Sequence, residues 1–275
     1  MITEVLLKQQ QPRHRTKCEM PMAFNKSPST SSNGRLIQLV RGDPDCASFY
    51  QWIHAELKKI TTNWPPQITT LTTGRQGNLG EFLSYRVARA SGLHGKSKGY
   101  TIALMGALTP LQDGAPTGLD ITIVHLDPDG DISKDCLYIM EVKTTGAVKL
   151  SYANALIDDY DKLLGKTKVA GSLGQRMNWL QAYLMDVHEF STEEMDRVGN
   201  LFQPKAEDCK GIRLLPTLVH DRKSGDLAAV ATLDEVAKQI ENLGWRKDCL
   251  EPWSIAITEL EKCFVHLSNN EGSMP

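Results

Sequence analysis

Three side chains that together suit the cleavage of phosphate esters lie within one short stretch of the sequence. They are Asp120, Glu141 and Lys143. Carboxylate oxygens are the ligands that Mg²⁺ takes in proteins, and the bound ion keeps several waters and bridges to phosphate oxygens. A lysine ammonium beside such an ion can orient the attacking water or help to deprotonate it, and it offsets negative charge on the phosphate. These residue types therefore indicate phosphodiester hydrolysis.

The three side chains lie at the ends of a segment that is typical of a β-hairpin. Two apolar runs rich in β-branched residues, 121–126 and 137–142, flank a polar insert that contains Pro128 and Gly130. If the turn is centred between Gly130 and Asp131, residues that face one another across the two strands have numbers that sum to 261.

With that register Asp120 faces Glu141. Side chains alternate along a strand, so Glu141 and Lys143 point to the same face of the sheet. Like charges directly across a ladder repel one another, and a hairpin held only by its own packing would tend to avoid them. The pattern therefore predicts a divalent cation, Mg²⁺ or Mn²⁺, between the two carboxylates.

A third acidic residue, Glu81, precedes the hairpin in the first turn of a helix predicted over residues 79–91. Together with Asn78 it matches a capping box, in which the glutamate only accepts a hydrogen bond from an exposed backbone N–H. A glutamate one helix ahead of the hairpin can also close over the same cation as a further ligand. The sequence leaves both roles open, and they are not exclusive.

Taken in order, these motifs resemble those of the PD-(D/E)xK nuclease superfamily over residues 79–165. Leu119 replaces the proline that often precedes the aspartate in that superfamily. The resemblance implies a restriction-endonuclease-like core whose catalytic and metal-binding groups are Glu81, Asp120, Glu141, the carbonyl of Val142, and Lys143. In that arrangement the three acids and the carbonyl hold the metal, and the lysine stands at the attacking water.

Within the superfamily the chain looks most like the nuclease subunit of Hachiman-type anti-phage defence systems. The likeness is carried by three short motifs in a compact chain: Gly80-Glu81, Gly118-x-Asp120 and Glu141-x-Lys143. It implies an antiviral defence effector, a Mg²⁺-dependent endonuclease that degrades or nicks DNA and works with a separate helicase partner.

Three other interpretations compete with this one. A restriction or repair endonuclease acting alone would use the same residues. A catalytically silent nuclease fold would bind DNA or a protein without cutting, although all the expected catalytic residue types are present. In a non-enzymatic interpretation the hairpin is a surface feature whose tip aspartates bind nothing: Asp127, Asp129, Asp131 and Asp135. That tip is not an EF-hand loop, because its glycine stands at the fourth position rather than the sixth.

The net charge of the 275-residue chain is −2, so DNA binding would have to rest on local basic patches. Two stretches, residues 82–112 and 162–176, contain several basic residues and no acid. They could equally be solvated faces balanced by acids elsewhere. The candidate nucleic-acid contacts are Arg86, Arg89, Lys96, Lys98, Lys149, Lys166, Lys168 and Arg176.

Six cysteines lie far apart without a Cys-x-x-Cys pair, which disfavours a zinc ribbon or an iron–sulfur cluster. No apolar run approaches the length of a membrane span, and residues 1–8 do not resemble the start of a signal peptide. We therefore expect a reduced, cytoplasmic protein.

With 41% apolar residues the chain can bury one large core, and we expect three regions around it. Residues 1–34 are predicted to be a flexible N-terminal tail because they offer little to bury. Residues 35–190 are predicted to form the nuclease core, and residues 191–275 a C-terminal α/β extension packed on the same core. The expected class is α/β, with a mixed central sheet flanked by helices.

Hydrophobic periodicity and turn residues predict the remaining elements. They are strands over residues 35–40, 100–108 and 253–258, a helix opened by Asp43-Pro44, a helix capped by Ser151, a helix over residues 173–187, and a helix opened by a capping box at Ser191-x-x-Glu194. Farther along, residues 212–220 and 227–232 are predicted to form a second hairpin, followed by a helix over residues 233–243.

Overall fold

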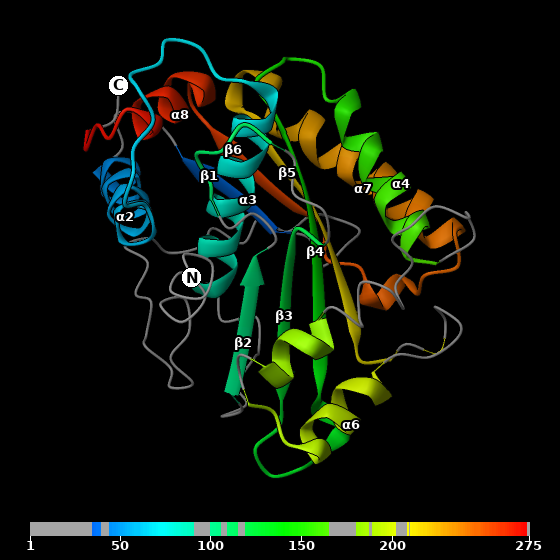
Figure 1. Cartoon of the computed structure of the whole chain (residues 1–275). Coiled ribbons are helices and arrows are strands. Elements are labelled where there is room, and N and C mark those ends of the chain that lie inside the picture. Colours follow the sequence, from blue (N-terminus) through cyan, green and yellow to red (C-terminus); the bar gives the residue numbers. More distant parts are fainter. Residues whose placement is uncertain are drawn as a thin grey trace.

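The computed structural model describes residues 35–39, 44–90, 100–105, 109–114, 119–164, 180–186, 189–201, 208 and 210–273. The tail predicted for residues 1–34 lies outside them. The described strands form one six-stranded sheet in the order β1-β6-β5-β4-β3-β2 (Figure 1). Their bounds are β1 Arg35–Leu39, β2 Tyr100–Met105, β3 Ile121–Leu126, β4 Cys136–Thr145, β5 Ile212–Asp221 and β6 Trp253–Ile257.

The sheet is mixed, as the sequence predicts. Strands β2, β3 and β4 pair antiparallel, whereas β4, β5, β6 and β1 pair in parallel. Residues 191–275, predicted as an extension, supply β5 and β6, and these two strands lie between β4 and β1 in the same sheet. The parallel strands are covered on both faces, which explains their nearly continuous apolar sequences.

The predicted register of the hairpin is confirmed. Ile121 pairs with Met140 and Thr122 pairs with Ile139, so the partner numbers sum to 261. The connection contains a short 3₁₀ turn, η1, Ile132–Lys134. The apolar runs and the turn residues together therefore sufficed to set which residues meet across the two strands.

Strand β4 is longer than its neighbour β3 at one end. The ladder between them ends at the pair of Ile121 and Met140, but β4 continues to Thr145 and stays paired with β5 as far as His220. Asp120, which immediately precedes β3, therefore lies beside the part of β4 that extends past this ladder. This is where the predicted acidic residues are found.

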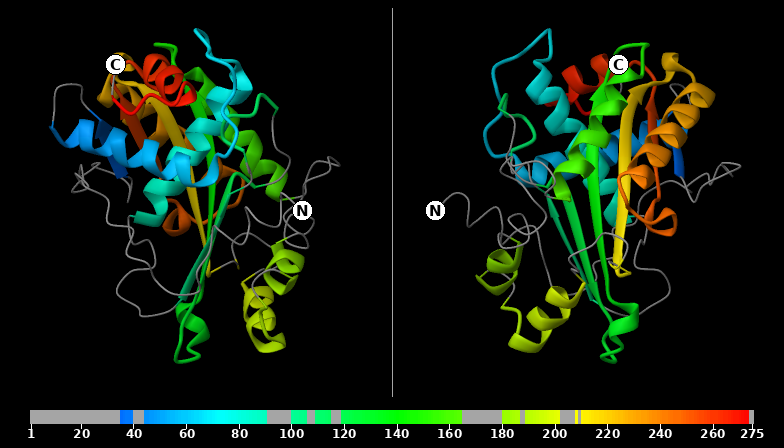
Figure 2. Two further views of the ribbon diagram at one scale, coloured as in Figure 1. Left: turned by 60° about the vertical axis from the view of Figure 1, so that its left-hand side comes forward. Right: turned by 90° about the vertical axis from the view of Figure 1, so that its right-hand side faces the viewer.

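Helices cover both faces of the sheet (Figures 1 and 2). Helices α2, Pro44–Ile60, α3, Thr73–Ala90, and α8, Leu260–Ser268, pack on one face. Helices α4, Ala155–Leu163, α6, Thr192–Asn200, and α7, Asp226–Asn242, belong to the apolar core of the other face. Of the helix predicted over residues 173–187, the described residues 180–186 are helical. None of the helices in the described parts of the chain is both long and apolar enough to cross a lipid bilayer.

Helix α3 begins at Thr73, six residues before the predicted start. The backbone N–H of Arg75 donates to Thr72 Oγ1 (3.2 Å), which satisfies one donor at the start of the helix. Asn78 lies inside the helix, and its side-chain amide donates to the carbonyls of Gln112 (2.9 Å) and Gly114 (3.0 Å). The predicted capping box of Asn78 and Glu81 is therefore wrong.

Two further expectations in the C-terminal half need correction, while a third is confirmed. Residues 227–232 do not pair with β5 but belong to α7, whose buried residues recur at helical spacing. Ser151 does not cap α4, because a 3₁₀ turn, η2, Ser151–Asn154, comes first and has Leu150 as its cap. The capping box of Ser191 and Glu194 is present at the start of α6.

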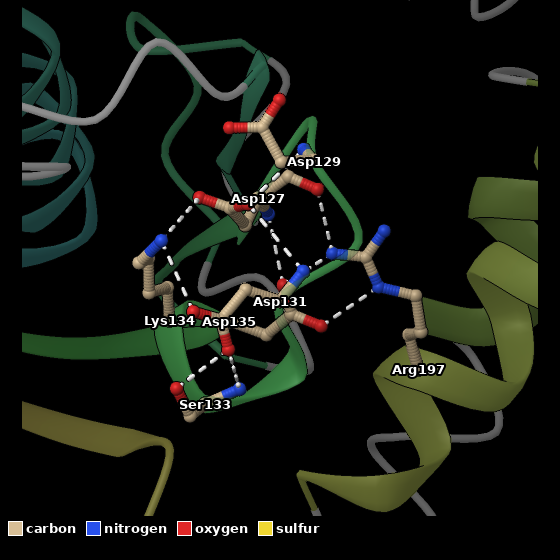
Figure 3. Close-up of polar contacts among 7 residues, drawn as sticks. All are labelled: Asp127, Asp129, Asp131, Ser133, Lys134, Asp135 and Arg197. Atoms are coloured by element: carbon tan, nitrogen blue, oxygen red, sulfur yellow. Dashed lines mark hydrogen bonds and ion pairs between the residues drawn. The ribbon is translucent and has the colours of Figure 1, made fainter.

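The tip of the hairpin is tied to α6 by a buried ion pair (Figure 3). Arg197 Nε donates to Asp135 Oδ2 (2.9 Å), and its Nη2 contacts Asp135 Oδ1 (2.5 Å) and the carbonyl of Asp127 (2.8 Å). The backbone N–H of Asp127 donates to Asp135 Oδ1 as well (2.8 Å). Asp131 accepts from the N–H and hydroxyl of Ser133 and pairs with Lys134 (3.0 Å). These tip carboxylates therefore serve the turn itself.

Candidate active site

Asp120 immediately precedes β3 and lies against the part of β4 that extends past the ladder between β3 and β4. The backbone N–H of Val142 donates to Asp120 Oδ2 at 2.7 Å. Val142 stands between Glu141 and Lys143 in the sequence, so the Asp120 carboxylate lies beside the stretch of β4 that carries both other predicted residues. This backbone contact shows that Asp120 lies next to the Glu141–Lys143 segment, as the hairpin register predicts.

Glu141 and Lys143 share a face of β4 with Leu137 and Ile139, which pack in the core beneath α4 and α7. The Glu141 side chain is buried and that of Lys143 is partly exposed. A carboxylate at the boundary between an apolar core and solvent is poorly hydrated, so it benefits from a nearby positive charge. Lys143 provides one such charge.

Lys143 is ion-paired with Asp159 of α4. The distance from Lys143 Nζ to Asp159 Oδ2 is 2.5 Å, and Lys162 Nζ lies 3.1 Å from Asp159 Oδ1. Burial lowers the pKa of Lys143, but the negative charges of Asp120, Asp159 and Glu141 outweigh it and hold this pKa above its ordinary value. Lys143 is therefore a cation at neutral pH, suited to orienting a water molecule and offsetting charge on a phosphate.

Asp159 is a residue that the sequence interpretation missed. It follows Lys143 by 16 positions, in the helix predicted after Ser151, where Leu156 and Tyr160 indicate only the apolar side. The sequence feature that could have identified Asp159 is its position next to a core tyrosine, in the helix directly after the strand that contains Glu141 and Lys143. Nothing in local spacing shows which polar side of a helix faces a neighbouring strand.

Tyr160, the next residue of α4, is hydrogen-bonded to the backbone of β4. Its side chain is fully buried, its hydroxyl donates to the carbonyl of Ile139 (3.2 Å), and the N–H of Glu141 donates to its oxygen (3.3 Å). Burial, and then the charge of Glu141, raise the pKa of Tyr160 well above its ordinary value, so the phenol keeps its proton. The Glu141 backbone is thereby fixed relative to α4.

Glu81 reaches the same group of residues from α3. Burial and the charge of Asp120 raise the pKa of Glu81 to about 9, against the lowering effect of Lys143. Among the described residues, Glu81 Oε2 is buried without a hydrogen-bond partner. The Glu81 carboxyl group is therefore buried within electrostatic reach of Asp120 and Lys143.

Gly80 allows α3 to pass directly over β4. A Cβ atom at Gly80 would overlap Thr144 Oγ1 and lie 2.9 Å from Thr144 Cβ. At Gly77, one turn earlier, an added Cβ would meet nothing within 4 Å. Because Gly80 has no side chain, α3 can approach β4 closely, and the neighbouring Glu81 comes near the hairpin.

We expect Gly80→Ala to lower the free energy of unfolding by about 1–3 kcal/mol, because the new methyl group must push α3 away from β4. Gly77→Ala is the matched control and should raise stability by about 1 kcal/mol or less, since alanine favours a helix over glycine. Urea unfolding of both variants gives the two values. Adding Thr144→Gly to Gly80→Ala should recover part of the loss, and a fully additive double variant would contradict the overlap.

The donor atoms are of the kind that a divalent cation prefers. Asp120, Glu141 and Glu81 offer carboxylate oxygens, the ligands that Mg²⁺ takes, and among the described residues Glu81 Oε2 is buried without a hydrogen-bond partner. In the part of the chain that the structure describes, no three acidic, histidine or cysteine side chains already converge as a metal site. Mg²⁺ needs only one or two carboxylates when waters and a phosphate complete its shell.

Glu81→Gln is expected to stabilise the metal-free protein at pH 8 by about 1–3 kcal/mol. The folded protein binds the Glu81 proton more tightly than the unfolded chain, since the pKa rises from 4.5 to about 9. The stability contributed by this proton is complete below about pH 4.5 and is lost as the pH rises through about 9. Thermal unfolding in EDTA across this pH range measures the effect.

The control is Glu241→Gln, which makes the same chemical change at an exposed position of α7. It should follow the wild-type curve of stability against pH, whereas Glu81→Gln should show a smaller decline. Mg²⁺ should stabilise the wild type more than Glu81→Gln. Parallel curves for the wild type and Glu81→Gln would show that the Glu81 carboxyl group is not strained.

The predicted nucleic-acid contacts have different surroundings. Arg86 is mostly buried and pairs with Glu56 of α2, while Arg89 donates to the hydroxyl of Tyr85 (3.4 Å). Arg86 therefore holds α2 on α3 and presents little of its side chain to a phosphate. Lys149 is exposed in the loop that follows β4. The other candidates lie outside the described residues: Lys96, Lys98, Lys166, Lys168 and Arg176.

Comparison of the chain with protein-family models, with curated proteins and with solved structures finds no match. The interpretation of the site therefore depends on its geometry and on the chemistry of its side chains.

Proposed function

We propose that this protein is a metal-dependent nuclease that hydrolyses DNA phosphodiester bonds with Mg²⁺ on a restriction-endonuclease-like core. One observation carries the proposal: the hairpin register and the contact between Asp120 and Val142 place Asp120 beside the β4 segment that carries Glu141 and Lys143. The buried Glu81 carboxyl group, influenced by Asp120 and Lys143, adds a third acid from another element.

The proposed chemistry divides among the side chains as follows. Asp120 and Glu141 would hold the cation, with Glu81 and the carbonyl of Val142 as further oxygen donors. When bound, a divalent cation withdraws charge from the phosphate oxygens and makes water a better nucleophile. Lys143, kept protonated by its acidic neighbours, would donate hydrogen bonds to the attacking water and to the phosphate.

Incubation of the purified protein with a circular plasmid tests the proposal. We expect nicked and then linear DNA with Mg²⁺, and intact plasmid with EDTA. A Lys143→Ala protein prepared in the same way controls for a contaminating nuclease. Plasmid left intact by the wild type with both Mg²⁺ and Mn²⁺, or equal cleavage by Lys143→Ala, would contradict the assignment.

We further propose that the enzyme is a cytoplasmic anti-phage defence effector that works with a separate helicase. The support is the resemblance of its three motifs to the nuclease subunit of Hachiman-type systems. Affinity purification of the tagged chain from its native cells should recover an ATP-dependent helicase, and Lys143→Ala should raise phage plaque counts in those cells. Cleavage and protection without any helicase would favour a restriction or repair endonuclease acting alone.

A further inference from the structure

Helix α4 contributes two consecutive residues to the site, and they reach it in different ways. Tyr160 is fully buried, and its hydroxyl is hydrogen-bonded to the backbone of β4, at Ile139 and Glu141. Asp159, about 100° away around the helix, contacts the side chain of Lys143. Because Tyr160 anchors this turn of α4 to β4, the position of the Asp159 carboxylate relative to Lys143 is fixed.

The Asp159 carboxylate is itself held from two sides. One oxygen lies 2.5 Å from Lys143 Nζ and the other 3.1 Å from Lys162 Nζ. The Lys143 and Asp159 side chains are only 18% and 13% exposed, whereas that of Lys162 is 40% exposed. The inner pair is therefore shielded from solvent, where an ion pair with good geometry is stronger than at the surface.

A lysine ammonium has three N–H donors on a flexible four-carbon stem. Without a fixed partner, Lys143 would be drawn to its other acidic neighbours, Asp120 and Glu141, both of which influence its pKa. Such a contact would occupy the carboxylate oxygens that the proposed function assigns to the cation. The ion pair with Asp159 keeps the ammonium at the side of the site, so that its N–H donors can serve the water and the phosphate.

We infer that Asp159 is a positioning residue that orients the Lys143 ammonium and keeps it away from the carboxylates of Asp120 and Glu141. This inference depends on the proposed nuclease function, which gives Lys143 its task, and it adds to the site a residue from an element outside the three motifs.

Asp159→Asn is the decisive variant, and Asp158→Asn is its matched control. Asp158 is the preceding residue of α4, is exposed, and undergoes the same chemical change. We expect Asp159→Asn to lower kcat for DNA cleavage by about 10- to 100-fold, the scale of a small misplacement of a reacting group. The KM for DNA should stay within about twofold, the Mg²⁺ concentration for half-maximal rate should rise, and Asp159→Glu should recover part of kcat.

A second readout does not require DNA cleavage. The side-chain ammonium of Lys143 can be followed by ¹⁵N NMR at mildly acidic pH and assigned through its loss in Lys143→Arg. An ion-paired ammonium exchanges its protons slowly, so we expect the signal in the wild type and Asp158→Asn and its loss in Asp159→Asn.

The outcomes separate this inference from the proposed function. If the wild type cleaves DNA and Asp159→Asn matches it in kcat and in Mg²⁺ dependence, the role of Asp159 is overturned and the nuclease stands. Retention of the Lys143 ammonium signal in Asp159→Asn overturns it in the same way. If the wild type fails to cleave DNA with either Mg²⁺ or Mn²⁺, the proposed function is overturned, and the role inferred for Asp159 is overturned as well.

Discussion

Lys143→Ala is expected to lower DNA cleavage by at least about 10²- to 10³-fold, the usual effect of removing one preorganised donor from an active site. The reason is that the ammonium, held protonated among Asp120, Asp159 and Glu141, lies close to the carboxylates that are proposed to hold the cation. Initial rates of plasmid nicking at saturating Mg²⁺ measure the loss. Glu141→Ala should lower cleavage to a similar extent, because it removes a buried carboxylate that is proposed to hold the cation.

Both variants should remain folded, since the backbone contacts of Tyr160 with β4 do not involve the altered side chains. Lys238→Ala and Glu241→Gln, at exposed positions of α7, control for unrelated changes of charge. Circular dichroism and thermal unfolding report whether the fold is retained. Undiminished cleavage by both Lys143→Ala and Glu141→Ala would end the nuclease proposal.

Arg197→Ala is expected to have the largest effect on stability, a loss of about 3–5 kcal/mol in the free energy of unfolding. The substitution leaves the Asp135 carboxylate, whose side chain is 1% exposed, buried without its cationic partner. It also removes the bond from Arg197 to the carbonyl of Asp127, which holds α6 on the hairpin tip. Urea unfolding monitored by circular dichroism gives the change.

A surface ion pair provides the comparison for this prediction. Arg246 pairs with Asp248, and these two side chains are 33% and 60% exposed, so Arg246→Ala should lower the stability far less than Arg197→Ala. Adding Asp135→Asn to Arg197→Ala should restore part of the stability, because the amide carries no charge to leave unpaired. Equal losses for Arg197→Ala and Arg246→Ala would refute the argument from burial.

The hairpin could be predicted because its information is local. Two β-branched runs and a turn with Pro128 and Gly130 leave one register that buries both apolar faces, and the observed pairs follow it. The residues Asp120, Glu141 and Lys143 are then brought together by the register alone. The mixed sheet with helices on both faces follows from strands that alternate with amphipathic helices.

The elements that were predicted wrongly depend on contacts distant in sequence. The start of α3 was missed because Gly74, Gly77 and Gly80 are typical of a loop, yet Gly74 and Gly80 are small where the helix meets Asp113 and Thr144. Residues 227–232 form a short apolar run that suits a strand or a helix equally. Among them only Ala229 is buried, and with Leu233 and Val236 it forms the buried side of α7 at helical spacing. The contact of Asp159 with Lys143 was missed for the same reason, because it joins two different elements of the chain.

The strand order has a consequence for how the protein is made. Strand β6 lies between β1 and β5, so the first strand of the sheet gains its partner only after residue 257 has been synthesised. Proteins whose contacts join distant parts of the chain fold slowly. A nascent chain that has not yet reached residue 257 would therefore lack β6, and β5 and β1 would each lack a partner in the sheet behind β4.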